Sequence, residues 1–146
     1  MIMNIEEVIR QVYSQARLLG ACHRFKGTEK TLEDIVALFC SPQGMEFCIN
    51  NRFPNMATFR LFKPFEPEKQ GVYIDSGVLT LRNPKRVVLV GRTSATITCD
   101  TLERHEVFLL HGAKAIINAS GWSVVSVSGS KGCQVIRNIS GNAVIL

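Results

Sequence analysis

The sequence predicts an α+β chain in two parts, an N-terminal helical cap followed by a short β-solenoid of about four rungs. Three observations lead to this fold class. The segment 87–99, VVLVGRTSATITC, is echoed twenty positions later by VFLLHGAKAIINA. The first part of the chain carries apolar residues at helical spacing, and a polar, proline-containing stretch separates it from the repeats. A repeated strand, turn and strand indicates a chain that coils on itself.

The first predicted helix spans residues 4–19. Asn4 can cap it, with Glu7 three residues further on in a capping-box arrangement. Gly20 provides a stop. One face of this helix carries apolar residues at helical spacing: Ile5, Val8, Ile9, Val12, Ala16 and Leu19.

Two further helices are predicted before residue 52. Thr31 and Asp34 resemble the start of a second helix, and Pro42 ends it. Ser41 as a cap, with Pro42 in the first helical position, then starts a third helix that continues to about Asn50. Four phenylalanines follow in residues 53–65, and we interpret them as core rather than as a ligand platform.

Residues 64–71, PFEPEKQG, form a polar connector that contains two prolines. The predicted domains are therefore a helical cap domain, 1–65, and a β-solenoid repeat domain, 71–146. We expect the helical part to cover one open end of the solenoid, because open sheet edges invite aggregation.

The repeats predict four rungs that start near Val72, Val87, Val107 and Val125, at offsets of fifteen, twenty and eighteen residues. The last residues, 142–146 (NAVIL), match the first strand of a fifth rung. A small antiparallel β barrel or sandwich is the alternative fold, since the same pattern of strand, turn and strand also describes a hairpin.

Alternation along each strand places Ala95 and Ile97 on the inner face of the rung. The matching run Ala115-x-Ile117 would stack on them in columns. In this respect residues 71–146 resemble short β-solenoid segments of bacterial and phage proteins. The resemblance is one of architecture, points to no named family, and brings no catalytic residue with it.

The bulk composition is that of a globular protein, with 46% hydrophobic and 20% charged residues among 146. No apolar run approaches the roughly 18 residues that cross a bilayer, and the acidic, amphipathic start is unlike a secretory signal. We therefore expect a cytoplasmic protein without a membrane partner.

The five cysteines are odd in number, which favours free thiols in a reducing compartment. A metal site formed by Cys22, His23, Cys40 and Cys48 is conceivable. The paired spacing typical of zinc sites is missing, so no metal and no cofactor are predicted.

The positive charge is concentrated in the repeats, where residues 71–146 hold eight Lys or Arg against four Asp or Glu. Polyanion or nucleic-acid binding through basic turns is therefore the alternative function, although no nucleic-acid-binding signature supports it. Stacked rungs would gather the candidate residues at two corners. The first corner would hold Arg92, His111, Lys114 and Lys131, and the second Arg82, Lys85, Arg86 and Arg104.

A small hydrolase-type enzyme is the third function considered, with His105 or His111 as its base. His105 lies in the charged run 103–106, which reads as an exposed loop. His111 occupies a turn position equivalent to Gly91 and Gly129, where a backbone-permissive residue is favoured. Phosphate-loop, nucleophile-elbow and metalloprotease patterns are absent from the sequence, so no catalytic residue is assigned.

The sequence thus favours a non-enzymatic binding or assembly protein that contacts its partners through the solenoid flank or the C-terminal rung. An uncapped final rung would expose Val144, Ile145 and Leu146 and invite self-association. We expect a homo-oligomer or a protein partner, and the sequence leaves a small-molecule ligand unknown.

Overall fold

The computed structural model describes residues 3–20 and 29–146. Two compact units make up the chain, residues 1–70 and residues 71–146. The first unit is helical and the second consists of β-strands. Cys22 and His23, two members of the conceivable metal set, lie outside the described residues.

In residues 3–20 and 29–70, the helical unit contains four α-helices and two short 3-10 helices. They are α1 (Ile5–Leu18), α2 (Leu32–Phe39), α3 (Pro42–Asn51), α4 (Met56–Leu61), η1 (Lys63–Phe65) and η2 (Pro67–Gln70).

The first three helices begin where their capping residues predict. The side chains of Asn4, Thr31 and Ser41 each accept a hydrogen bond from the backbone N–H three residues on, at 2.9, 3.2 and 3.2 Å. Each bond satisfies one of the donors that a helix leaves open at its start. Local capping chemistry therefore fixes these three starts.

The helix α4 was not predicted, because its six residues are too few to show a helical period. The side chain of Asn55 caps it by accepting the Thr58 N–H at 2.9 Å. Just before it, the ring of Phe53 contacts those of Phe39 and Phe47 edge-on, with centroids 5.5 and 5.4 Å apart. Phe53 is buried and the other two rings are half-buried, so this aromatic cluster packs within the helical unit.

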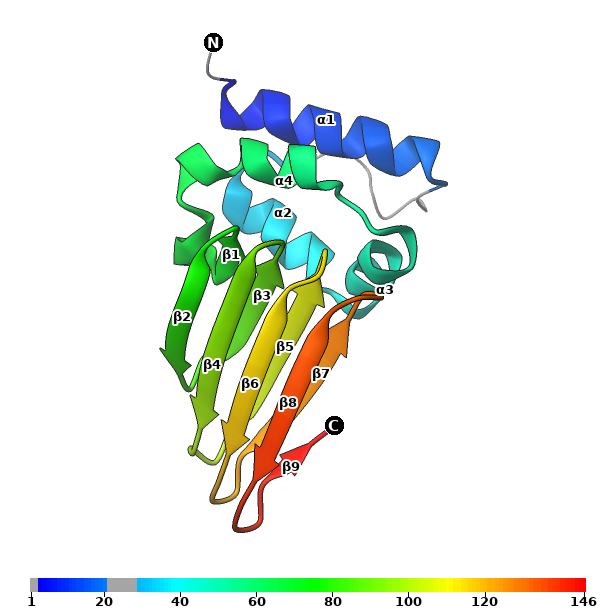
Figure 1. Cartoon of the computed structure of the whole chain (residues 1–146). Helices are drawn as coiled ribbons and strands as arrows, with labels where there is room; N and C mark the ends of the chain where they lie inside the picture. Colours follow the sequence, from blue (N-terminus) through cyan, green and yellow to red (C-terminus); the bar gives the residue numbers. More distant parts are fainter. Residues whose placement is uncertain (1–2, 21–28) are drawn as a thin grey trace. The chain divides into compact units, whose positions relative to one another are not determined.

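The second unit is a β-solenoid of about four turns, each turn of which contributes one strand to each of two parallel sheets (Figure 1). Sheet A has the order β1-β3-β5-β7-β9 and sheet B the order β2-β4-β6-β8. All strand pairs are parallel, which rules out the alternative antiparallel barrel or sandwich. The strands are β1 (Val72–Ile74), β2 (Gly77–Arg82), β3 (Arg86–Val90), β4 (Thr93–Cys99), β5 (Arg104–Leu110), β6 (Lys114–Ala119), β7 (Val124–Gly129), β8 (Gln134–Ile139) and β9 (Val144–Ile145).

The central repeat has the register that the sequence predicts, since Val87 pairs with Val107 and Ile97 with Ile117. The outer offsets were wrong. The first step is sixteen residues rather than fifteen, so that Val72 pairs with Val88. The last steps are twenty rather than eighteen. A shift of two residues preserves the alternation of faces, so alternation alone cannot tell eighteen from twenty.

The solenoid core is one stacked apolar cluster between the two sheets, and it contains the predicted inward residues. Small side chains on sheet B face larger ones on sheet A, which gives a thin core without crowding. Its members from the second and third turns are Val87, Leu89, Ala95, Ile97, Cys99, Val107, Leu109, Ala113, Ala115, Ile117 and Ala119.

Candidate binding surfaces of the solenoid

The last coil, formed by β8 and β9, ends both sheets in the described part of the chain. The backbone N–H of Gln134 donates to the Ala113 carbonyl of the preceding turn at 3.2 Å. Hydrogen bonding alternates between the two sides of a parallel strand. The backbone groups of Val135, Arg137 and Ile139 therefore point away from β6, along an edge that no strand of residues 71–146 covers.

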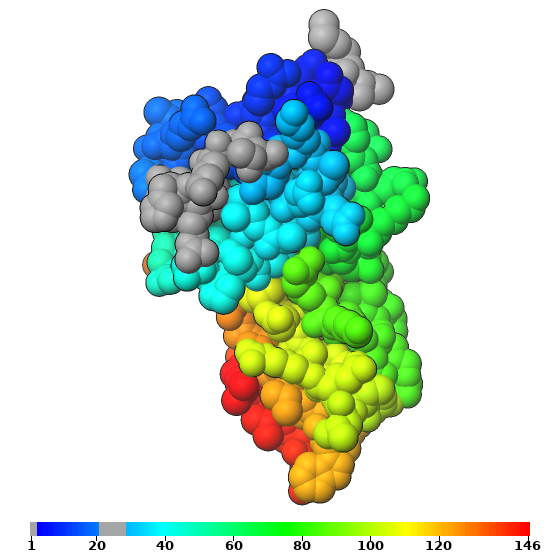
Figure 2. All heavy atoms as spheres, turned by 180° about the vertical axis from the view of Figure 1, so that it is seen from behind, coloured from blue at the N-terminus to red at the C-terminus, as the bar shows by residue number. Residues whose placement is uncertain are grey.

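Apolar side chains are exposed around this edge. On β8, Ile136 is 57% and Ile139 is 53% exposed. Val144 and Leu146 are also exposed, as the sequence predicts, whereas Ile145 is half-buried and packs against the core. Figure 2 shows the C-terminal segment in red at the surface, beside the orange residues of the preceding turn.

Arg137 occupies an inner position of the last coil that sequence reasoning missed. Its Cα pairs with that of Ile117, which pairs in turn with Ile97. Leu81 begins this column of apolar residues. The predicted offset of eighteen had matched Val135 with Ile117, and this hid the arginine. The offset of twenty that relates Val87 to Val107 also relates Ile117 to Arg137, and it identifies Arg137 as the inner residue.

One outer row of sheet B is polar in its first turns and apolar in its last. Thr80 and Thr96 are followed in the same outer row by Ile116 and Ile136. In the adjacent row the Asn138 side-chain amide donates to the Asn118 side-chain oxygen at 2.9 Å. The solenoid flank and the last coil thus share Ile136.

The four predicted basic residues of the first corner do lie at one corner of the solenoid, at the turns that lead from sheet A to sheet B. Arg92 lies in the loop between β3 and β4, and Lys131 lies in the loop between β7 and β8. Lys114 is the first residue of β6, in the coil between them. All three residues are exposed. Asp75 is the acidic residue of this corner, and its side chain accepts the backbone N–H of Arg92 at 2.8 Å. His111, with φ 56°, donates its backbone N–H to Ser130 Oγ at 3.2 Å.

The second corner mixes basic and acidic residues. Arg82 forms an ion pair with Asp100, whose carboxylate also accepts the Asn83 side-chain amide at 2.8 Å. Arg86 pairs across the sheet with Glu106. The remaining predicted residues, Lys85 and Arg104, flank these pairs in sequence. Glu103 is a third acid at this corner. Four cations therefore face three acids here, whereas three cations face Asp75 at the first corner.

Leu102 and Trp122 form an exposed apolar pair at the second corner that sequence reasoning also missed. They occupy equivalent positions in successive turns, twenty residues apart, and both side chains are mostly exposed. Stacked turns bring such positions to roughly 4.8 Å in backbone spacing. The twenty-residue repeat carries this signal in its turns as well as in its strands.

His105 is buried in β5, so its prediction as part of an exposed loop was wrong. The ring Nδ1 lies 2.7 Å from the Pro84 carbonyl oxygen and Nε2 lies 3.3 Å from Thr101 Oγ1. This side chain faces the interior, as that of Val107 does two residues later, and it is 0% exposed. His111 lies at the other end of the strand, roughly 20 Å away at the strand rise per residue. The two histidines cannot form one site.

The described cysteines include two buried free thiols, Cys48 and Cys99. Burial raises the pKa of the Cys48 thiol to about 12, with a smaller contribution from Cys40. Burial, followed by the charge of Asp100, raises the pKa of Cys99 to about 11. Over residues 3–20 and 29–146 no cluster of three potential ligands that could hold a metal ion is found.

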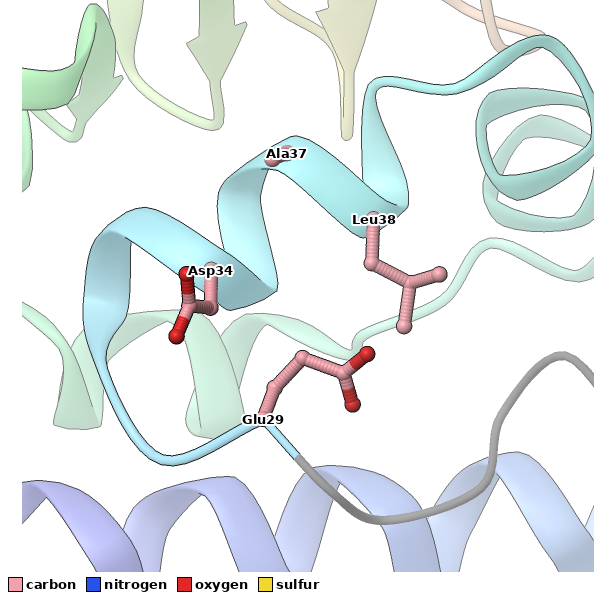
Figure 3. A pocket seen from close by; sticks show the side chains of 4 residues that line it. All are labelled: Glu29, Asp34, Ala37 and Leu38. Carbon is pink, nitrogen blue, oxygen red and sulfur yellow. The ribbon is translucent and has the colours of Figure 1, made fainter.

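A shallow pocket in the helical unit is lined by Glu29, Asp34, Ala37 and Leu38 (Figure 3). The Tyr13 hydroxyl donates to the Glu29 carboxylate, and the Asp34 backbone N–H donates to Thr31. The lining therefore combines two carboxylates with two aliphatic side chains. One of the carboxylates, that of Glu29, accepts a hydrogen bond from Tyr13.

None of the described helices has the length and apolar character that a membrane crossing requires. No family model matches the sequence, and neither the curated proteins nor the solved structures contain a match to it.

Proposed function

We propose that the chain is a non-enzymatic binding or assembly protein, and that its last coil binds another protein by adding a strand to the open edge of β8. The observation that carries this proposal is the exposed edge itself. The backbone groups of Val135, Arg137 and Ile139 face away from β6, and apolar side chains surround them. A docked strand would gain main-chain hydrogen bonds from the edge and specificity from the alternate side chains.

Self-association is the alternative in which the partner is a second copy of the chain. It would run through β9 at the end of sheet A, with Val144, Ile145 and Leu146 in or beside the interface. Light scattering of the chain, and of a version that lacks residues 142–146, measures this directly. A dimer that becomes a monomer on truncation supports self-association, and two monomers of equal stability contradict it.

A peptide selection tests strand addition for any partner. A random library of 12-residue peptides is selected on the immobilised chain, and the enriched peptides are synthesised. We expect apolar residues to alternate in them with period two. Their binding should weaken at least tenfold when Ile136 and Ile139 are both changed to Lys. Val78→Lys is the control, because Val78 is an exposed apolar residue on sheet B three turns away. Peptides that bind the double variant unchanged contradict the proposal.

The second candidate is polyanion binding at the first corner. It is supported by the exposed cations Arg92, Lys114 and Lys131, which lie at one corner with Asp75 as its acid. Binding to heparin should fall steeply with salt, since cations that neutralise a polyanion release its counterions.

Substitution of these three residues by Ser provides the test of this second candidate. We expect it to weaken heparin binding much more than the same substitution of Lys85, Arg86 and Arg104. The two triple variants have the same net charge. Equal losses would indicate attraction by net charge alone and contradict a site at the first corner.

We also propose that the protein functions in the cytoplasm. The free thiols of Cys48 and Cys99, placed within apolar cores, support a reducing compartment.

A further inference from the structure

We propose that Arg137 makes the last coil selective. In this proposal the charge of Arg137 prevents β8 from pairing with a second copy of the chain. It favours a partner strand that places a carboxylate directly opposite Arg137. The inference rests on the proposed function of the last coil, and it names the chemistry of the partner.

The first step is the position of Arg137. It continues the inner column of Leu81, Ile97 and Ile117, yet it is a charged residue with an exposed side chain. Within the described part of the chain, no hydrogen bond or ion pair of its guanidinium is found. A cation therefore stands at the open end of an apolar column.

The second step is what a docked strand would do to this cation. Residues directly opposite on adjacent strands have Cβ atoms about 4.5–5.5 Å apart, so the partner's inner residue would face Arg137 directly. Docking would also take the guanidinium out of water, which is costly without a partner. A carboxylate removes the cost and can accept two parallel hydrogen bonds from the guanidinium.

The third step concerns a second copy of the chain, whose edge strands on sheet B supply no such carboxylate. Its open strand β2 reads GVLTLR and its β8 reads QVIRNI, neither of which contains Asp or Glu. Pairing with β2 would bury Arg137 in an apolar column, and pairing of two β8 strands would bring a second arginine into the interface. An inward-pointing charge is one of the devices by which natural sheets prevent edge-to-edge pairing.

The neighbours of Arg137 define the rest of the partner's pattern. Val135 and Ile139 share its inner face, two residues before and after it. A partner strand that complements this face carries apolar residues two positions before and two positions after its acidic residue. The partner is therefore an extended segment of the form apolar-x-Asp/Glu-x-apolar.

The experiment repeats the peptide selection on three proteins: the unchanged chain, Arg137→Glu, and Gln134→Glu. Gln134 is exposed on the same strand, but its side chain is on the outer face, so its substitution is the matched control. Peptides selected on the unchanged chain should contain Asp or Glu, with an apolar residue two positions before it and another two positions after it. They should bind Arg137→Glu at least tenfold more weakly and Gln134→Glu within about twofold. Changing the peptide acid to Lys should restore binding to Arg137→Glu.

The outcomes separate the two proposals. Peptides whose binding needs Ile136 and Ile139 but does not change with the charge at position 137 would overturn the proposed selectivity. The proposal of strand addition would still stand. Self-association of the unchanged chain through β8 does the same. Peptides that ignore Ile136 and Ile139 overturn strand addition, and the inference on Arg137 falls with it. A selection that enriches no peptide dependent on β8 also overturns both. Circular dichroism of each variant verifies that the strands remain folded.

Discussion

The third and last turns of the solenoid share the same columns, yet they fill them differently. On β6 the inner residues Ala115, Ile117 and Ala119 are almost completely buried. Their partners on β8 are Val135, Arg137 and Ile139, which are half-buried or exposed. Each rung of a solenoid buries its core face only against its neighbours. The third turn has a neighbour on both sides, whereas the last has one within the described residues.

The corners of the two turns differ in the same way. Ser123 is buried, and its hydroxyl is 3.0 Å from the Cys99 carbonyl oxygen and 2.8 Å from that of Ser120. Twenty residues later Ala143 occupies the equivalent position and has no hydroxyl. The interior turns are therefore selected for packing and internal hydrogen bonds. The proposed binding role of the last coil would account for this difference.

The strongest test of this comparison is a pair of alanine substitutions in the same column. Ile117→Ala should lower the free energy of unfolding by about 3 kcal/mol, because it leaves a cavity in a packed core. Arg137→Ala should change it by less than about 0.5 kcal/mol, as is usual for an exposed side chain. Urea denaturation followed by circular dichroism measures both. Equal losses would show that the last turn is as much a part of the core as the third.

The second test gives the last turn the residue found in the interior. Arg137→Ile completes the column of Leu81, Ile97 and Ile117 and removes the charge that protects the edge. We expect the variant to self-associate, with a scattering mass that rises with concentration, because an uncharged apolar edge is a template for pairing. Gln134→Ile adds the same side chain on the outer face and should leave the mass unchanged. A monomeric Arg137→Ile protein would contradict the protective role of the charge.

The sequence predicted most of the architecture of the interior turns, and the reason is visible in the columns. Val87 with Val107 and Ile97 with Ile117 are conserved between neighbouring rungs because each residue has to fit the one above and below it. Capping residues such as Asn4 likewise fixed helix starts by local chemistry. Constraints of this kind are written in nearby sequence.

The candidate site could not be predicted to the same extent, because the last turn departs from the repeat that reveals the others. Arg137 does not resemble Ile117, so the alignment slipped by two residues to the more similar Val135. His105 was misplaced for a related reason. Charged neighbours suggested a loop, whereas the backbone carbonyl of Pro84, which no pattern shows, allows the ring to be buried. Tertiary partners of polar groups are invisible to periodicity.

A smaller effect is expected at the turns. Ser123→Ala removes the hydroxyl that bonds two backbone carbonyl oxygens, and it should cost about 1 kcal/mol of unfolding free energy. Ala143→Ser introduces the missing hydroxyl in the last turn and should change stability by less than about 0.5 kcal/mol. Urea denaturation of the two variants gives the difference. A neutral Ser123→Ala would show that the serine is dispensable in the third turn as well.

The smallest expected effect is the pH dependence of stability that arises from Cys99, which pairs with Ala119 in the next turn. Folding raises the pKa of the Cys99 thiol from 9.0 to about 11, mainly by burial. The folded chain therefore retains a proton that the unfolded chain loses above pH 9, so stability falls as pH rises from 9 toward 11. Between pH 8 and 10 the loss due to Cys99 should be on the order of 1 kcal/mol.

Cys99→Ala isolates this contribution, since the equivalent position of the next turn already holds Ala119 and accommodates that side chain. The variant should be less sensitive to alkaline pH than the unchanged chain, and Cys48 should account for part of the sensitivity that remains. In the last turn, the half-buried thiol of Cys133 should react with a thiol reagent faster than Cys99, because it is less enclosed. Equal labelling rates would mean that the last turn excludes solvent as well as the interior does, and the distinction between core and binding surface would then fail.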